Sequence, residues 1–159
     1  MINMKTNNIN DQKLIQKKFE FFDVTADIGF WAYGKTLEEA FENAALAMFN
    51  VITDTEKVAK KETKEIYVES EDKISLLYDF LEELLVLQEV DLILCSDFQV
   101  AIKKEIKGKD EVYKLNAIAI GENIDWNIHE RKSEVKAITF HMMEVLCEDI
   151  FKVRVILDL

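Results

Sequence analysis

Three carboxylates in this sequence have the positions and the chemistry to form a binding site. Asp27 directly precedes the apolar run 28–32, at the start of a predicted strand, and Asp158 is the penultimate residue of the chain. The third group is the α-carboxylate of Leu159. If the strands that carry them are neighbours, like charges crowd together, which raises the pKa of a carboxyl group. A hard divalent cation such as Ca²⁺, Mg²⁺ or Mn²⁺ relieves this repulsion and prefers oxygen ligands.

Lys136, in a neighbouring predicted strand, could supply a cation that balances these carboxylates. The alternative is that Asp27 and Asp158 are solvated acids at strand ends, and the residues alone leave both interpretations open. Motifs for other chemistry do not occur, since the sequence lacks GxGxxG, GxxxxGKS/T, GxSxG and HExxH. The histidines, His129 and His141, have no cysteine at zinc-finger spacing, so a zinc site is not indicated.

The two cysteines, Cys95 and Cys147, lack CxxC spacing and fit an intracellular chain with buried thiols, although a single disulfide between them stays open. Cys147 could form a nucleophilic pair with His141, which lies nearby in the sequence. Its surroundings, MEVLC, are apolar and favour a small buried side chain instead.

The composition limits the classes of partner. With 20 Lys and Arg against 31 Asp and Glu, the formal net charge is −11, whereas nucleic-acid binders need cations for phosphate contacts. We therefore expect contact with RNA only through a partner. The sequence has no N-terminal apolar leader and no apolar run near the ~20 residues that span a bilayer. No membrane association and a cytoplasmic location are expected.

Two helices are predicted from apolar residues that recur at intervals of three and four. They cover 36–52, where Thr36 and Glu39 have capping-box spacing, and 73–90. Period-two alternation predicts strands around 65–69, 98–103, 113–117, 135–140 and 152–159. With the apolar segments 19–22 and 28–33 added, about seven strands are expected.

These elements predict an α+β fold, because the strands after residue 90 are consecutive. We expect a two-layer sandwich: one antiparallel or mixed sheet of about six to seven strands, with both main helices on one face. The 159 residues suit one domain, at 19–159. The Asn- and Lys-rich stretch 1–18 is predicted to be a mobile N-terminal extension.

Three segments, in order, resemble the archease family. FEFFDVTADIGFWAYGKTLEEAFENAALAMF, at 19–49, is similar to the family signature, a D-H-T-A-D motif followed by a short strand and G-x-T-L-E-E-A-F. EVKAITFH at 134–141 and VRVILDL at 153–159 match two further blocks. The resemblance extends from about residue 19 to the last residue, and it implies a single archease-like domain.

The resemblance implies an accessory protein rather than an enzyme. Archeases are protein cofactors of the RtcB-type tRNA-splicing ligase, which joins RNA ends bearing a 2′,3′-cyclic phosphate or 3′-phosphate to a 5′-hydroxyl. They promote guanylylation of that ligase and restore its multiple turnover, while the GTP and the catalytic metal belong to the ligase. The family's activating residues map onto Asp27, Lys136 and Asp158. Its metal ligands map onto Asp27, Asp158 and the terminal Leu159, with Ca²⁺ expected first and Mg²⁺ or Mn²⁺ as alternatives.

One residue departs from the family pattern. Val24 stands where D-H-T-A-D has its histidine, so the resemblance carries no histidine metal contact over to this chain. Two other functions stay open beside ligase activation. One is a chaperone-like modulator of another tRNA enzyme, such as a methyltransferase. The other is a metal-dependent hydrolase in which Asp27 and Asp158 help to activate water, although the sequence offers it no convincing general base.

Overall fold

The computed structural model describes residues 17–159, in which seven strands, two α-helices and one short 3₁₀ helix follow one another. In chain order they are β1 (Phe19–Val24), β2 (Asp27–Gly34), α2 (Leu37–Ile52), η1 (Thr55–Lys57), β3 (Glu62–Ser70), α3 (Lys73–Val90), β4 (Ile93–Lys107), β5 (Asp110–Asn123), β6 (Ala137–Cys147) and β7 (Phe151–Asp158). The N-terminal extension expected at 1–18 lies outside the described residues, except for residues 17 and 18. The division into an extension at 1–18 and a domain at 19–159 therefore stays a prediction.

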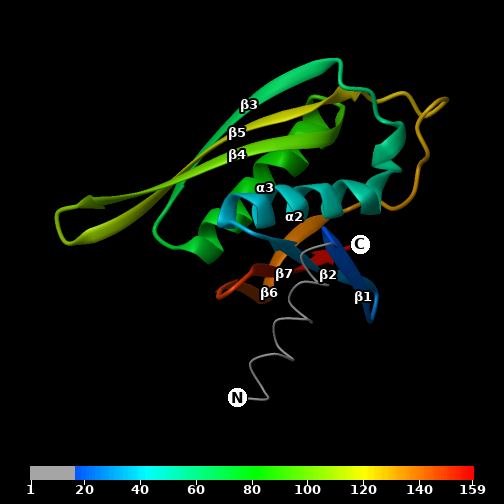
Figure 1. Ribbon diagram of the computed structural model, residues 1–159. Coiled ribbons are helices and arrows are strands. Elements are labelled where there is room, and N and C mark those ends of the chain that lie inside the picture. Colours follow the sequence, from blue (N-terminus) through cyan, green and yellow to red (C-terminus); the bar gives the residue numbers. More distant parts are fainter. Residues whose placement is uncertain (1–16) are drawn as a thin grey trace.

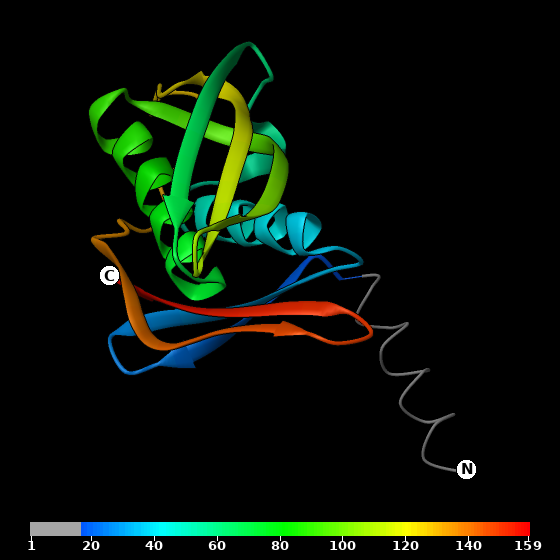
Figure 2. The ribbon, with the colours of Figure 1, turned by 90° about the vertical axis from the view of Figure 1, so that its left-hand side faces the viewer.

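The strands form two sheets, in which every neighbouring pair is antiparallel. A four-stranded sheet has the order β1-β2-β7-β6, and a three-stranded sheet has the order β3-β5-β4. The two helices lie between the sheets: α2 packs on both β2 and β4, and α3 packs on both β3 and β6 (Figure 1). Figure 2 shows the four-stranded sheet as a separate layer below the helices.

The α+β class, the seven strands and the two helices are as predicted from the sequence. The single sheet with both helices on one face was wrong, because the helices separate two sheets. The reason lies in α2, whose buried side chains extend around most of its circumference instead of one stripe, as expected for a helix covered on two sides. They are Ala40, Phe41, Asn43, Ala44, Ala45, Ala47, Met48, Phe49, Val51 and Ile52.

Both helices begin at side-chain caps. The hydroxyl of Thr36 accepts the backbone N–H of Glu39 at 3.1 Å, so α2 begins one residue later than the predicted range 36–52. Asp72 accepts the N–H of Ser75 at 2.7 Å, and α3 has the predicted bounds, 73–90. No helix in the described part of the chain is both long and apolar enough to cross a membrane.

The two cysteines are not bonded to each other and differ in exposure. Cys95 is fully buried, and burial raises the pKa of its thiol to about 12. Cys147 is exposed, so the predicted burial of this side chain was wrong. Its alternation places it on the inner face of β6, but it is the last residue of an edge strand, where it contacts the polar side chain of Lys73 at the start of α3.

Candidate functional site at the end of the four-stranded sheet

The register of the four-stranded sheet brings Asp27 and Asp158 together. In the β2–β7 pair, Asp27 lies directly opposite Asp158. Directly opposed residues of an antiparallel pair project from the same face, with Cβ atoms about 4.5–5.5 Å apart. The next pair, Ile28 and Leu157, packs into the core, so the two carboxylates project from the outer face, away from the helices. The juxtaposition that a shared site requires is therefore present.

Lys136 and the chain terminus lie at the same end of this sheet. The N–H of Lys136 donates to the carbonyl oxygen of Asp158 at 2.8 Å, and Ala137, the first residue of β6, is opposite Asp158. Leu159 follows Asp158 directly, which places the α-carboxylate beside the two side chains. Lys136 and Asp158 are exposed and Asp27 is half-buried, so a partner molecule can reach the group. We call these four residues the carboxylate end.

The donors at the carboxylate end are oxygens. Within residues 17–159, no three His, Cys, Asp or Glu side chains gather closely enough to hold a metal ion. Asp27 and Asp158 therefore form a pair without a third such side chain in this part of the chain, and the third ligand expected from the sequence, the α-carboxylate of Leu159, is a backbone group. On the other side of Asp27, its partner in β1 is Val24, whose side chain offers no donor atom. Two side-chain carboxylates and a terminal carboxylate make a donor set that fits a hard divalent cation.

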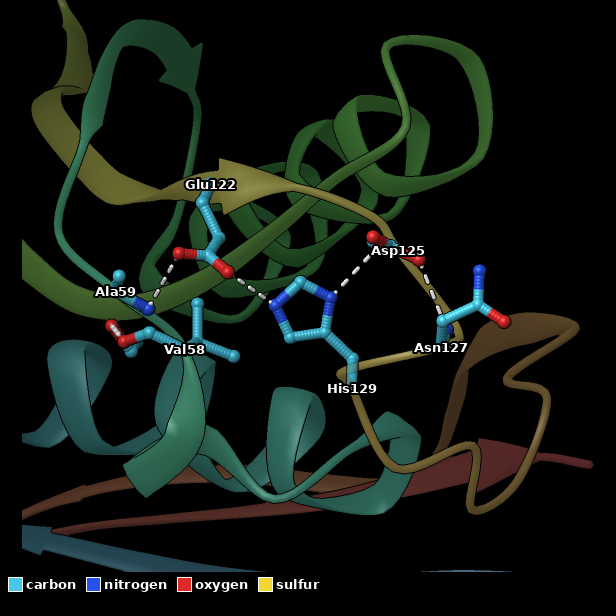
Figure 3. A network of polar contacts seen from close by, with 7 residues as sticks. Val58, Ala59, Glu122, Asp125, Asn127 and His129 are labelled. Carbon is cyan, nitrogen blue, oxygen red and sulfur yellow. Dashed lines mark hydrogen bonds and ion pairs between the residues drawn. The ribbon is translucent and has the colours of Figure 1, made fainter.

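A buried polar network anchors the segment 124–136, which ends at Lys136 (Figure 3). Nδ1 of His129 accepts the N–H of Asp125 at 3.0 Å, so the ring proton resides on Nε2, which donates to Glu122 at 2.5 Å. The second carboxylate oxygen of Glu122 accepts the N–H of Ala59 at 3.0 Å. Glu122 and His129 are 6% and 3% exposed, and this network is their structural role.

Sequence reasoning missed this network, because its hydrogen bonds join residues up to 63 positions apart and follow no motif. The segment 124–136 that it anchors carries the chain from the three-stranded to the four-stranded sheet. Further along, the N–H groups of Lys132 and Ser133 each donate at 3.0 Å to carbonyl oxygens of the last turn of α2, those of Ile52 and Val51. The fold thus positions Lys136 through a segment fixed at several points.

The suggested Cys147–His141 pair does not form. Cys147, at the other end of β6 from Lys136, accepts a hydrogen bond from the ammonium of Lys73 at 3.6 Å. No hydrogen bond joins Cys147 to His141 in the structure of residues 17–159. Both side chains are exposed, and His141 lies where the β6–β7 register is interrupted. The structure therefore offers no base for this thiol.

Known proteins are similar to this chain over nearly all of the described residues. The model of the archease protein family (MTH1598/TM1083) matches residues 19–159. A protein archease of Methanothermobacter thermautotrophicus is 57% identical over 144 residues, which cover 90% of this chain and 99% of that protein. A protein archease of Pyrococcus abyssi is 52% identical over 129 residues, covering 81% and 88%.

The fold is similar to a solved structure as well. The solution structure of protein 1598 of Methanobacterium thermoautotrophicum superimposes with a TM-score of 0.73 at 52% sequence identity. The match covers 89% of this chain and 99% of that one. Sequence, family model and fold agree with the resemblance seen in the three ordered segments, and the chain belongs to the archease family.

Proposed function

We propose that this protein is an accessory factor that activates an RtcB-type RNA ligase in tRNA splicing, by promoting guanylylation of the ligase and its multiple turnover. The observation that carries the proposal is the direct opposition of Asp27 and Asp158 beside the chain terminus, in a member of the archease family. The protein itself is proposed not to be an enzyme. The residues for the reaction, and the GTP, belong to the ligase.

The carboxylate end is proposed to hold a divalent cation, Ca²⁺ first and Mg²⁺ or Mn²⁺ as alternatives. Its ligands are Asp27, Asp158 and the α-carboxylate of Leu159. Three carboxylates and the ammonium of Lys136 carry a formal charge that one divalent cation neutralises. When bound, the cation supplies a positive charge that can polarise phosphoryl oxygens. Lys136 lies at the same end of the sheet and is exposed, so its ammonium is proposed to contact a phosphate of the partner's substrate.

The charge of the chain supports a protein as the direct partner. A net charge of −11 repels RNA phosphates but complements an enzyme that is basic because it binds RNA. Complementary potentials accelerate association and orient the two proteins. In this proposal, RNA contacts the activator only as a substrate already bound to the ligase.

Guanylylation of the ligase tests the proposal. Purified RtcB-type ligase is incubated with GTP and divalent metal, with and without this protein, and covalent GMP on the ligase and RNA ends joined per ligase are followed. We expect faster guanylylation and several turnovers with the wild type, and neither with Asp158→Asn, which keeps the shape of the side chain. Equal rates with and without the wild type would refute the proposal. Phosphoesterase activity without ligase would instead favour the hydrolase.

A further inference from the structure

The C-terminal end of α3 exposes large apolar side chains. Val86, Val90 and Leu92 are 42%, 70% and 57% exposed. Val86 and Val90 are four residues apart on one helix, so they share a face, and Leu92 follows in the turn to β4. We call these three residues the α3-end patch. Single exposed apolar residues are ordinary, but a run of three at one helix end is a candidate interaction surface.

Leu92 adopts a backbone conformation that is unfavourable for leucine. Its φ is 57°, in the left-handed region, where glycine or asparagine usually terminates a helix. The conformation is fixed, because the carbonyl oxygen of Leu92 accepts the N–H of Ile124 at 2.8 Å, while the preceding N–H of Asp91 donates to Leu87 at 3.1 Å. Leu92 therefore has an unfavourable backbone conformation and an exposed apolar side chain. Strained backbone conformations of this kind are common at functional sites.

The charges around the patch also oppose local stability. Glu82, Glu83, Glu89 and Asp91 lie on the same part of α3 or just after it, and the last turn carries no basic residue. Helix C-termini favour cations, so the two acids nearest the end are unfavourably placed. None of the four carboxylates forms an ion pair within residues 17–159. The patch therefore has an acidic rim whose carboxylates form no direct ion pair among the described residues.

We propose that the α3-end patch is the docking surface for a protein whose complementary surface has an apolar centre and a rim of Lys and Arg. This inference rests on the proposed function, which makes that protein the RNA ligase. Exposed apolar side chains, an acidic rim and a strained leucine each cost stability in the free protein, and all three become favourable against such a surface. A nucleic acid does not fit, because its phosphates would meet the acidic rim.

The location connects this surface to the carboxylate end. The bond between Leu92 and Ile124 ties the patch to the start of the segment 124–136, whose last residue is Lys136. Figure 1 shows the start of β4, this segment and the C-terminus at one end of the molecule, and the tip of the β4–β5 hairpin at the other. A single partner could therefore contact the patch and the carboxylate end together.

Leu92→Asn is the decisive variant, because asparagine tolerates a positive φ and removes the apolar side chain. We expect thermal stability equal to or above that of the wild type, which separates docking from folding. Binding to immobilised ligase should weaken at least tenfold. The concentration that gives half-maximal guanylylation should rise by the same factor while the maximal rate is unchanged. Ile106→Ser is the matched control, since Ile106 is 74% exposed near the far hairpin tip and should bind normally.

Charge reversal tests the rim. The double variant Glu89→Lys with Asp91→Lys should slow association and reduce its dependence on salt. The inference is overturned if Leu92→Asn binds the ligase as tightly as the wild type, or if the wild type binds RNA and Leu92→Asn does not. Asp158→Asn keeps the α3-end patch intact, so its affinity for the ligase should fall less than that of Leu92→Asn, yet it should fail to activate the ligase. Failure of the docking surface is thereby distinguished from failure of the proposed function, in which the wild type binds but accelerates nothing.

Discussion

The network of Glu122 and His129 makes a prediction about stability that rests on hydrogen-bond geometry. The carboxylate of Glu122 accepts two donors, the N–H of Ala59 and the ring N–H of His129. His129 has no alternative tautomer here, because its Nδ1 must accept the N–H of Asp125. Glu122→Gln keeps the side-chain shape but replaces one acceptor oxygen by an NH₂ group. One of the two donors therefore loses its acceptor and faces another donor.

The expected loss can be estimated from burial. An unsatisfied buried donor costs about 1–3 kcal/mol. His129 is 3% exposed and excludes water, whereas Ala59 is only half-buried, so water can compensate there if the amide turns toward His129. We expect Glu122→Gln to lower the free energy of unfolding by about 2 kcal/mol, which corresponds to a midpoint temperature lower by about 4–8 °C in a chain of this length.

Urea unfolding at pH 7, followed by circular dichroism and tryptophan fluorescence, measures this difference. Trp126 reports on the anchored segment itself, because it lies there with the guanidinium of Arg131 4.9 Å from its ring centroid. Glu65→Gln is the matched control: Glu65 is an exposed strand residue and should tolerate the same change. If Glu122→Gln proves as stable as Glu65→Gln, the assigned tautomer and the double acceptor role of Glu122 are both incorrect.

Three further predictions concern the carboxylate end and the cysteines. A short Gly-Ser tail after Leu159 converts the terminal carboxylate into an amide, so it should reduce ligase activation at least tenfold without changing the unfolding midpoint. An N-terminal tag is the control and should be tolerated. A tailed protein that is fully active would exclude the terminal carboxylate as a ligand. Val24→His places an imidazole opposite Asp27, and imidazole nitrogen is a better ligand for Zn²⁺ than for Ca²⁺. Calorimetric titrations should therefore show a larger increase in affinity for Zn²⁺ than for Ca²⁺, and equal increases for the two ions would contradict this geometry. Iodoacetamide at pH 8 should modify the exposed Cys147 but not Cys95, because burial raises the pKa of the Cys95 thiol to about 12. Mass spectrometry of peptides from the labelled native protein measures this, and a labelled Cys95 peptide would contradict the burial of Cys95.

Short-range patterns determined the secondary structure. The range 73–90 coincides with α3, and Thr36 caps α2 as its spacing to Glu39 predicts, because capping and helical periodicity involve residues within a few positions of each other. Five of the strands, β3 to β7, were recognisable by alternation within each one, although β4 extends well beyond the predicted range 98–103. The segments that became β1 and β2 were recognised only as short apolar runs. The three segments that resemble the archease family also contain Asp27, Lys136 and Asp158, so the candidate residues are identified by their immediate neighbours in the chain.

Strand pairing was beyond such local patterns. Alternation says which residues of a strand share a face, but neither which strand lies beside it nor in which register. The opposition of Asp27 and Asp158, the separation of seven strands into two sheets and the burial of α2 on two sides follow from contacts between distant segments. The same holds for the exposure of Cys147, which depends on the position of β6 at the edge of its sheet.

The sequence alone thus determined the helices, the strands, the family and the residues with ligand chemistry, because each is encoded by neighbours in the chain. Only the tertiary structure decided that two acids far apart in the chain are cross-strand partners, that Glu122 and His129 are joined by a hydrogen bond, and that Leu92 is held at a positive φ. These features depend on packing and on hydrogen bonds between segments, and folding selects them together as the arrangement that buries the core and pairs its polar groups.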